Sequence, residues 1–405
     1  MLMKYDLVVI GAGPAGMGAA IIAASHGARV ALVDENPVPG GKLRGQIYKE
    51  PKSGWWIGEK IARNMENKIK QLGVPCFLEC EVWGIYPKWK VMLNNGEQLE
   101  SDFVLIATGA AEKAIPIPGW TKPGVMAIGA AQVLANIQRV KPGNRVAIIG
   151  LDVLSLTIAY DLKMAGVDVV GIYLPPLNAF SSDKSNPLKM IAYLSSLSHL
   201  APNPMLKLLG KIGQKESVQK LGVNYYPPFG MRVWGIPLHL RKAVVEITGN
   251  DIVEEIEIAT VDRNGQLGRK QEKRISVDCV CISGGLLPLV ELASAAGCEC
   301  VHIEELGGLI PLYNDQLETT QSGVFVAGNS TGIEGAKVAM AQGELVGTVI
   351  SDQIGLVKDG PELIKKAKEK VSLERENAVI KFHPGLENGR EKLERLSRIS
   401  EVNHY

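Results

Sequence analysis

The sequence predicts an α/β protein with two doubly wound sheets of parallel strands, the second sheet unit being inserted into the first. Strand–turn–helix–strand patterns begin at residue 5 and again at residue 146. An apolar strand at 324–327, followed by a helix expected at 332–354, can complete the first sheet. Alternating strands and helices are typical of doubly wound folds. The length of 405 residues also exceeds what one hydrophobic core usually holds.

Composition excludes several classes of protein. Hydrophobic residues make up 46% of the chain, charged residues 21%, and the formal net charge is +1, so neither nucleic acid nor an anionic membrane is an expected partner. No apolar run reaches the roughly 18 residues of a membrane helix. The N-terminus lacks the successive regions of a signal peptide. We therefore expect a cytoplasmic protein with no transmembrane segment.

The first unit begins with a short, continuous apolar strand at 7–10, as expected where both faces of a sheet are covered. An alanine-rich helix at 15–24 and a strand at 28–33 follow. The Pro and Gly residues of 35–54 predict a loop. The remaining expected elements are a helix at 56–72, short antiparallel strands over 74–101 and an apolar strand at 103–107.

A glycine motif joins the first strand to the first helix. Gly11, Gly13 and Gly16 match G-x-G-x-x-G, in which the glycines permit a tight turn, backbone approach to a pyrophosphate, and close helix–strand packing. The helix N-terminus then offers free N–H groups and partial positive charge to phosphates. Asp34 ends the second strand, where a carboxylate can accept hydrogen bonds from ribose hydroxyls. These features predict a Rossmann-like dinucleotide site.

A proline- and glycine-rich linker at 116–124 precedes the second unit, which is expected to hold a strand at 146–149, a helix at 153–165 and a strand at 167–173. An insertion at 175–215 and a strand-rich stretch at 223–283 follow. The tail from 355 is charged and is expected to form two helices. We predict a discontinuous first domain (1–118 and 300–354), a second domain at 119–299, and a helical tail at 355–405.

The nucleotide motif of the second unit is degenerate. Gly150 survives, but Asp152 stands where backbone would approach a pyrophosphate. Like charges about 4 Å apart repel by on the order of 1–4 kcal/mol. The second strand ends in Tyr173-Leu-Pro-Pro, without an acid for a ribose. Asp152 can alternatively serve as a helix N-cap. Both interpretations argue against ordinary NAD(P)H binding, and whether another nucleotide binds there stays open.

The six cysteines predict packing rather than redox chemistry. Cys279 and Cys281 share one face of an apolar strand, and the loop at 40–48 contains no cysteine. No cysteine follows Cys300, so the tail cannot supply four ligands for an iron–sulfur cluster. The six histidines show no metal-ligand spacing. We expect no metal in this chain.

Two segments resemble the FAD motifs of glutathione-reductase-like flavoproteins. Residues 103–109, FVLIATG, resemble the strand that ends in A-T-G, and residues 319–329, TTQSGVFVAGN, resemble the second FAD motif. The family usually has Asp at the last position, where this chain has the uncharged acceptor Asn329. The following helix would direct its positive N-terminus at the flavin, an effect that Glu334, expected in the first turn, partly opposes.

A narrower resemblance covers roughly residues 5–350. Residues 115–126, IPIPGWTKPGVM, with the later GAAQ at 129–132, resemble the FAD-binding subunit of heteromeric opine oxidases, hydrogen cyanide synthases and proline or hydroxyproline dehydrogenases. Gly40-Gly41, Gln46-Ile-Tyr48, Gly307-Gly308 and Pro311 fit the same pattern. The resemblance implies a partner flavoprotein subunit that oxidises the substrate. The absent tail cysteines favour a separate small iron–sulfur protein as the electron exit.

The sequence therefore predicts an FAD-dependent subunit that passes electrons in an opine, proline, hydroxyproline or glycine type of dehydrogenase. Two alternatives are a stand-alone NAD(P)H-dependent flavin oxidoreductase and a non-catalytic nucleotide-binding scaffold. No catalytic residue can be assigned. The residues expected to contact FAD are Gly11, Gly13, Pro14, Ala15, Gly16, Asp34, Glu35, Gly41, Gln46, Thr108, Gly109, Gly328, Asn329, Gly335 and Ala336.

Overall fold

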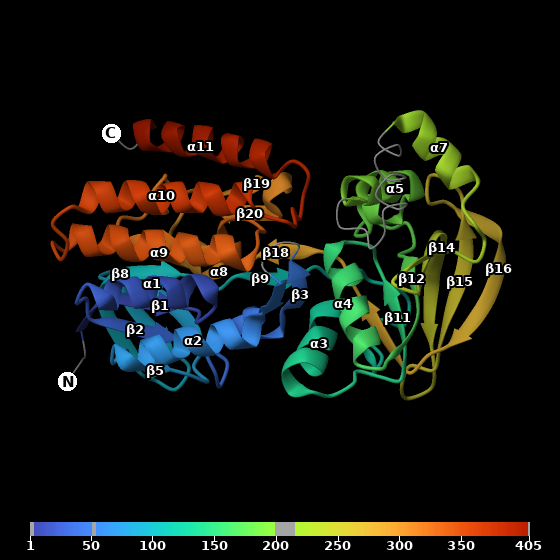
Figure 1. The fold of residues 1–405 in the computed structure, drawn as a ribbon, viewed down its shortest axis with the longest axis horizontal. Helices are drawn as coiled ribbons and strands as arrows, with labels where there is room; N and C mark the ends of the chain where they lie inside the picture. Colours follow the sequence, from blue (N-terminus) through green and yellow to red (C-terminus); the bar gives the residue numbers. More distant parts are fainter. Residues whose placement is uncertain (1–3, 51–53, 199–214, 404–405) are drawn as a thin grey trace. The chain divides into compact units, whose positions relative to one another are not determined.

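The computed structural model describes residues 4–50, 54–198 and 215–403, and the chain divides into two compact units. Unit 1 comprises Met1–Ala111 and Leu286–Tyr405, and unit 2 comprises Glu112–Gly285. Both are built of helices around a sheet with a parallel core (Figure 1). The predicted fold class, α/β with a second Rossmann-like unit inserted in the first, is confirmed.

The sheet of unit 1 has parallel strands at its centre and an antiparallel excursion at one side. In the described residues its order is β5-β2-β1-β8-β7-β6, and β21 pairs with β8. Strand β21 lies parallel to β8, so the C-terminal part of the chain completes the first sheet. The strands are β1 (Lys4–Ile10), β2 (Val30–Val33), β5 (Cys76–Phe77), β6 (Val82–Tyr86), β7 (Lys90–Leu93), β8 (Gln98–Ile106) and β21 (Val324–Val326).

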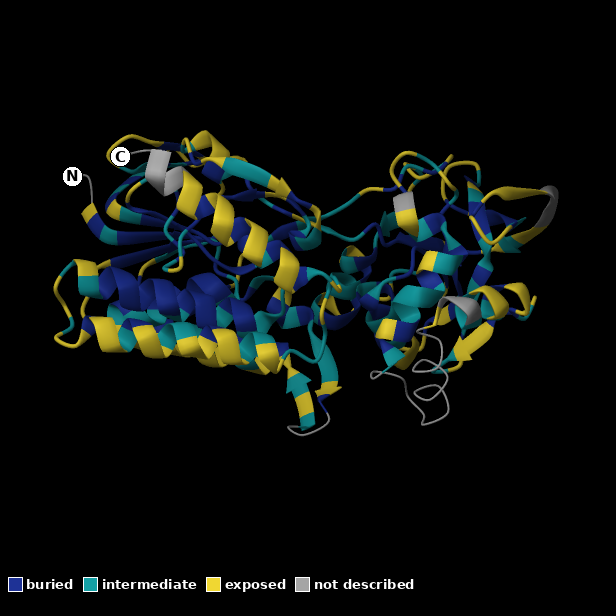
Figure 2. Cartoon of the chain, turned by 90° about the horizontal axis from the view of Figure 1, so that it is seen from above, coloured by how far each residue is buried: buried dark blue, intermediate teal, exposed yellow. Residues whose placement is uncertain are grey.

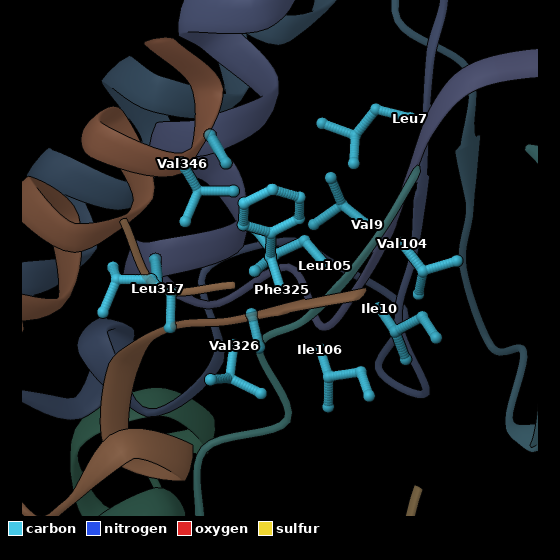
Figure 3. Close-up of a cluster of buried hydrophobic side chains, with 14 of the residues drawn as sticks. Leu7, Val9, Ile10, Val104, Leu105, Ile106, Leu317, Phe325, Val326 and Val346 are labelled. Carbon is cyan, nitrogen blue, oxygen red and sulfur yellow. The ribbon is translucent and has the colours of Figure 1, made fainter. Parts of the chain in front are cut away.

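Two helices of unit 1 pack closely because glycine removes the side chain at their contact. Helix α1 (Pro14–Ser25) lies along α9 (Ala336–Gln353). A Cβ atom on Gly343 would lie 1.9 Å from the Ala15 carbonyl oxygen, so a larger residue would separate the helices. Figure 3 shows the adjoining core, in which Val9, Leu105 and Phe325 of three neighbouring strands face Val346 of α9.

The charged tail forms α10 (Gly360–Glu376) and α11 (Leu386–Asn403), as the sequence predicts. Helix α10 packs along α9, and α11 packs against the strand β19 (Cys300–Ile303) and the following turn. Figure 2 shows α9 largely buried, whereas the outer faces of α10 and α11 are exposed. The tail is therefore part of unit 1, although the sequence predicts a separate segment from 355.

Unit 2 contains a second mixed sheet around parallel strands. In the described residues its order is β10-β17-β11-β12-β14-β15-β16, and β13 pairs with β14. The strand β12 (Asp168–Leu174) lies parallel to β11 (Arg145–Ile149), with α4 (Val153–Met164) between them in the chain. The other strands are β10 (Val125–Ala127), β13 (Met231–Val233), β14 (Ile236–Thr248), β15 (Glu255–Val261), β16 (Leu267–Ser276) and β17 (Cys279–Ile282).

The expected loop at 35–54 is partly wrong. It contains β3 (Ile47–Glu50), which pairs with β4 (Gly54–Ile57), and Trp56 lies in that strand instead of opening a helix. Helix α2 accordingly begins later, at Gly58, and ends at Gln71. Tyr48 stacks on Trp56 at 5.8 Å between ring centroids, a cross-strand contact that stabilises the hairpin.

The unit limits follow strand pairing. Strand β18 (Leu286–Pro288) pairs with β9 (Ala110–Glu112), which brings the chain back to unit 1 before the expected limit at 299. Of the insertion at 175–215, α5 (Pro187–Ser196) is seen, and 199–214 lie outside the described residues. Among the described helices, none is both long and apolar enough to cross a bilayer.

Candidate functional site

The turn after β1 contains three glycines of the motif. Two of them are packed against backbone, and the third faces open space. Gly11 has φ of 101°, and a Cβ atom there would lie 2.4 Å from the Ala107 carbonyl oxygen. A Cβ atom on Gly16 would lie 1.9 Å from the Gly11 carbonyl oxygen. At Gly13 a Cβ atom would meet nothing within 4 Å. Gly13 is thus the position where a ligand can approach the backbone.

Helix α1 starts without a side-chain cap. Its N-cap, Gly13, carries no side chain, and Pro14 occupies the first turn, where a missing N–H costs no hydrogen bond. Free N–H groups and the positive end of the helix dipole therefore point out of the turn beside Gly13. This arrangement suits a pyrophosphate.

Asp34 fastens the glycine turn to the end of β2. Its Oδ2 accepts from the Ala12 N–H at 2.5 Å, and its Oδ1 accepts from the Asn36 N–H at 2.8 Å. The side chain of Asn36 donates to the same Oδ1 at 2.9 Å. Asp34 is 8% exposed, and a carboxylate has about four acceptor positions, so capacity for a ribose hydroxyl remains. Its neighbour Glu35 is exposed.

The loop after β2 folds back over the glycine turn. The Gly40 N–H donates to the Ala12 carbonyl at 2.8 Å, and a Cβ atom on Gly41 would lie 3.4 Å from the Gly13 Cα. Gln46 accepts from the Gly58 N–H at 2.8 Å through its carbonyl. The sequence-predicted residues Gly13, Gly41 and Asp34 are therefore brought together.

A second pair of loops meets at the ends of β8 and β21. The Gly109 N–H donates to Ser330 Oγ at 3.0 Å, and Thr108 Oγ1 donates to the Leu289 carbonyl at 3.2 Å. Gly109 has φ of 79°, and a Cβ atom there would meet nothing within 4 Å. A Cβ atom on Gly328 would lie 3.1 Å from the Ala15 Cβ, so this turn adjoins α1.

The turn that follows β21 is held by buried polar side chains. Gln342 is 1% exposed, and its Oε1 accepts from the Gly328 N–H at 2.7 Å. Asn329 Oδ1 accepts from the Glu334 N–H at 3.1 Å. The sequence predicts neither Gln342 nor Ser330 as part of the site. Ser330 directly follows the FAD-like motif, whereas no pattern distinguishes Gln342.

Helix α9 also begins without a side-chain cap. Its N-cap, Gly335, would place a Cβ atom in open space, and Ala336 is its first residue. The expectation that Glu334 lies in the first turn is wrong, because Glu334 precedes the N-cap. Its carboxylate pairs with Arg375, at 3.2 Å, and with Arg390.

The corresponding position in unit 2 is filled by the protein itself. Asp152 is the N-cap of α4, and its Oδ1 accepts from the Ser155 N–H at 2.9 Å. Lys184 Nζ lies 2.6 Å from Asp152 Oδ2, and Ser283 Oγ donates to the carboxylate at 2.9 Å. Burial alone would raise the pKa of Asp152, but the Lys184 charge and the hydrogen bonds outweigh burial and lower that pKa. The N-cap interpretation is confirmed.

The end of β12 provides few groups that could bind a second nucleotide. Tyr173 stacks on His239 at 4.8 Å, with the planes 14° apart. Burial, followed by the charges of Lys242 and Arg232, lowers the pKa of His239 to about 4, so this imidazole is neutral at pH 7. Lys184 and Ser283 lie far from Asp152 in the sequence, and no motif connects them.

The cysteines are free, and Cys279 and Cys281 are fully buried with 3.9 Å between their sulfur atoms. Hydrogen bonding to Cys279 and burial raise the pKa of Cys281. Within the described ranges, no group of three or more His, Cys, Asp or Glu side chains is placed to hold a metal ion.

Comparisons with known proteins agree with this geometry. Residues 5–185 and 231–343 match the family described as pyridine nucleotide-disulphide oxidoreductase. An opine oxidase subunit of Agrobacterium tumefaciens (strain Ach5) is 30% identical over 87% of this chain and 66% of its own length. Hydrogen cyanide synthase subunit HcnB of Pseudomonas protegens is 28% identical over 90% of this chain and 74% of its own.

Solved structures support the fold. The crystal structure of L-proline dehydrogenase from P. horikoshii aligns with a TM-score of 0.63 and 19% identity, over 91% of this chain and 59% of that chain. The chain thus spans about two thirds of the opine oxidase relative and a smaller share of the solved dehydrogenase chain.

Proposed function

Since the chain belongs to the pyridine nucleotide-disulphide oxidoreductase family and is an FAD-dependent oxidoreductase, we propose that it is one subunit of a heteromeric amine or amino-acid dehydrogenase. In this role it binds FAD in unit 1. A separate flavoprotein subunit oxidises the substrate, and this chain takes the electrons from that subunit and passes them to an acceptor. The relatives from opine oxidase and hydrogen cyanide synthase are themselves named as subunits, which supports this proposal.

The residues present fit FAD. Open space at Gly13, Gly109 and Gly335 admits a ligand along three neighbouring loops, and two uncapped helix N-termini supply N–H groups. We assign the pyrophosphate to the turn at Gly11–Gly16, with Pro14 and Ala15 opening the helix. Asp34 and Glu35 lie on the ribose side. The flavin end is assigned to Gly41, Gln46, Thr108, Gly109, Gly328, Asn329, Gly335 and Ala336.

The observation that carries the proposal is the carboxylate of Asp152 at the second nucleotide motif. This anion already occupies the N-terminus of α4 and is balanced by Lys184. A pyrophosphate would have to displace this carboxylate from the Ser155 N–H and from Lys184. The cysteines offer no alternative route, because none lies in the 40–48 loop beside the first glycine turn. Both features support a subunit that exchanges electrons with other carriers.

The experiment compares the isolated chain with the chain co-expressed with its gene neighbours. Proline, hydroxyproline, glycine, sarcosine and opines are assayed with an artificial dye acceptor. We expect turnover only when a second, co-purifying subunit is present. Turnover by the isolated chain would contradict the subunit role. A purified chain that carries an adenine nucleotide and no flavin would instead support a scaffold function.

A further inference from the structure

The C-terminal tail places two arginines on a single carboxylate beside the loop that leads into α9. Glu334 Oε1 lies 3.2 Å from Arg375 Nε of α10, and Glu334 Oε2 is in contact with Arg390 Nη2 of α11. The Glu334, Arg390 and Arg375 side chains are 10%, 16% and 29% exposed. Partly buried ion pairs such as these are screened by solvent and salt much less than exposed pairs are.

The group is tied to the turn that carries Asn329. The Glu334 N–H donates to Asn329 Oδ1 at 3.1 Å. Arg390 Nη1 donates to the Tyr313 hydroxyl at 3.4 Å, and that hydroxyl donates to the Thr331 carbonyl at 3.1 Å. Thr331 is fully buried in the turn after Gly328. The arginines are therefore fixed relative to the N-terminus of α9.

The charges of this group do not cancel. Lys337, Lys368 and Lys370, on α9 and α10, each have a carboxylate partner, at 2.8, 2.6 and 2.5 Å. Glu334, in contrast, faces two guanidinium groups, which leaves one positive charge in excess among these three side chains. The pKa of Arg375 is lowered, mainly by burial and to a smaller extent by the charge of Arg390. For Arg390, burial also lowers the pKa, but Tyr313 and Glu334 outweigh it, so the net shift is upward.

We propose that Arg375 and Arg390 make the C-terminal tail an electrostatic part of the flavin site, raising the reduction potential of the FAD bound in unit 1. Without them, Glu334 would oppose the positive end of the α9 dipole. With them, the sign of the local charge is reversed. Reduction by two electrons and one proton adds one negative charge to a flavin, and a nearby positive charge favours that product. The inference rests on the proposed FAD site.

Neither arginine is placed in contact with substrate, so both are positioning residues rather than catalytic ones. A merely structural role would attach the tail to unit 1 and affect unfolding, but it would leave the potential of a retained flavin unchanged. The two roles therefore separate in a redox measurement.

The test is an anaerobic dithionite titration of the purified, flavin-loaded chain against an indicator dye. For Arg390→Met we expect about a tenfold lower equilibrium constant for flavin reduction, a potential about 30 mV more negative for a two-electron couple. Glu334→Gln should shift the potential by a similar amount in the positive direction. The double variant, which restores one excess positive charge, should return close to the wild-type value.

Two controls accompany these variants. Arg390→Lys keeps the charge and should stay near the wild-type potential. Arg398→Met removes an exposed arginine of the same helix, paired with Glu394, and should have no effect. Thermal unfolding of each apoprotein verifies folding. Loaded variants with an unchanged potential would overturn the charge assignment alone, whereas a folded wild-type chain that takes up no FAD would overturn the proposed function and this inference together.

Discussion

Gly13 lies in the glycine turn and Asp34 lies just after β2, and variants at the two positions should have different effects. Gly13→Val fills the open space where backbone meets the ligand, so FAD retention should be lost while the fold survives. Asp34→Ala removes the acceptor of the Ala12 and Asn36 N–H groups, so weaker retention and a stability loss of about 1–3 kcal/mol are expected.

The measurement is the flavin-to-protein ratio after gel filtration, together with thermal unfolding. Asp6→Ala serves as a control, because Asp6 lies in β1 but pairs with Arg29 outside the glycine turn. Full flavin occupancy in both Gly13→Val and Asp34→Ala would show that the site is misplaced.

Variants of Asp152 test whether its carboxylate prevents nucleotide binding at the glycine motif of unit 2. Asp152→Gly removes the charge, so NADH should bind measurably to this variant, whereas we expect no tight binding to the wild-type chain. Asp152→Asn keeps an acceptor for the Ser155 N–H and is the matched variant for the cap. Calorimetric titration with NADH gives the readout. No gain of affinity in either variant would mean that the missing ribose acid at Tyr173–Pro176, rather than the charge, excludes the nucleotide.

At the scale of residues, the sequence predicts groups that act through local spacing. Gly11, Gly13, Gly16 and Asp34 follow a motif, and the N-cap role of Asp152 follows from its place before a helix. Lys184 and Ser283 reach Asp152 only through the folding of unit 2, so no local pattern indicates them. The predicted position of Glu334 is wrong because α9 begins at Ala336, after the glycine N-cap.

A buried carboxyl on α4 should make the stability of unit 2 depend on pH. Burial raises the pKa of Asp161 to about 6, and hydrogen bonds from Asn136 and Gln132 only partly oppose this shift. The folded state then binds more protons than the unfolded state between about pH 4 and 6. The free energy of unfolding should fall as pH rises through that range, by on the order of 3 kcal/mol, and stay lower above it.

Asp161→Asn removes this titration and can still accept from Asn136. The variant should therefore gain stability relative to the wild type as pH rises from 4 to 6. Urea unfolding at several pH values measures the difference, with the exposed Asp168→Asn as the control. Parallel curves for Asp161→Asn and the wild type would refute the assignment.

At the scale of elements, strands and helices with strong periodicity are predicted well, and short irregular ones are not. The segments β1, α1 and β11 follow from apolar runs and glycine turns. The β3–β4 hairpin is missed because Pro and Gly residues surround it, and because the Tyr48–Trp56 contact that supports it forms only across the paired strands. The packing of α10 on α9 likewise depends on tertiary contacts, which the charged sequence of the tail does not predict.

At the scale of the whole molecule, the two units differ in what their glycine motifs can hold. Unit 1 leaves its motif open, whereas unit 2 fills its own with Asp152. We keep the domain limits at 118/119 and 299/300 as a proposal, and limited proteolysis can compare them with the compact-unit limits at Glu112 and Gly285.

The most direct test of the central claim is one visible absorption spectrum of the purified chain, recorded before and after anaerobic addition of NADH. An open motif in unit 1 and a closed one in unit 2 predict an oxidised flavin band that persists after NADH is added. A protein without a flavin band would contradict the FAD site, and rapid bleaching of the band by NADH would contradict the closed second motif.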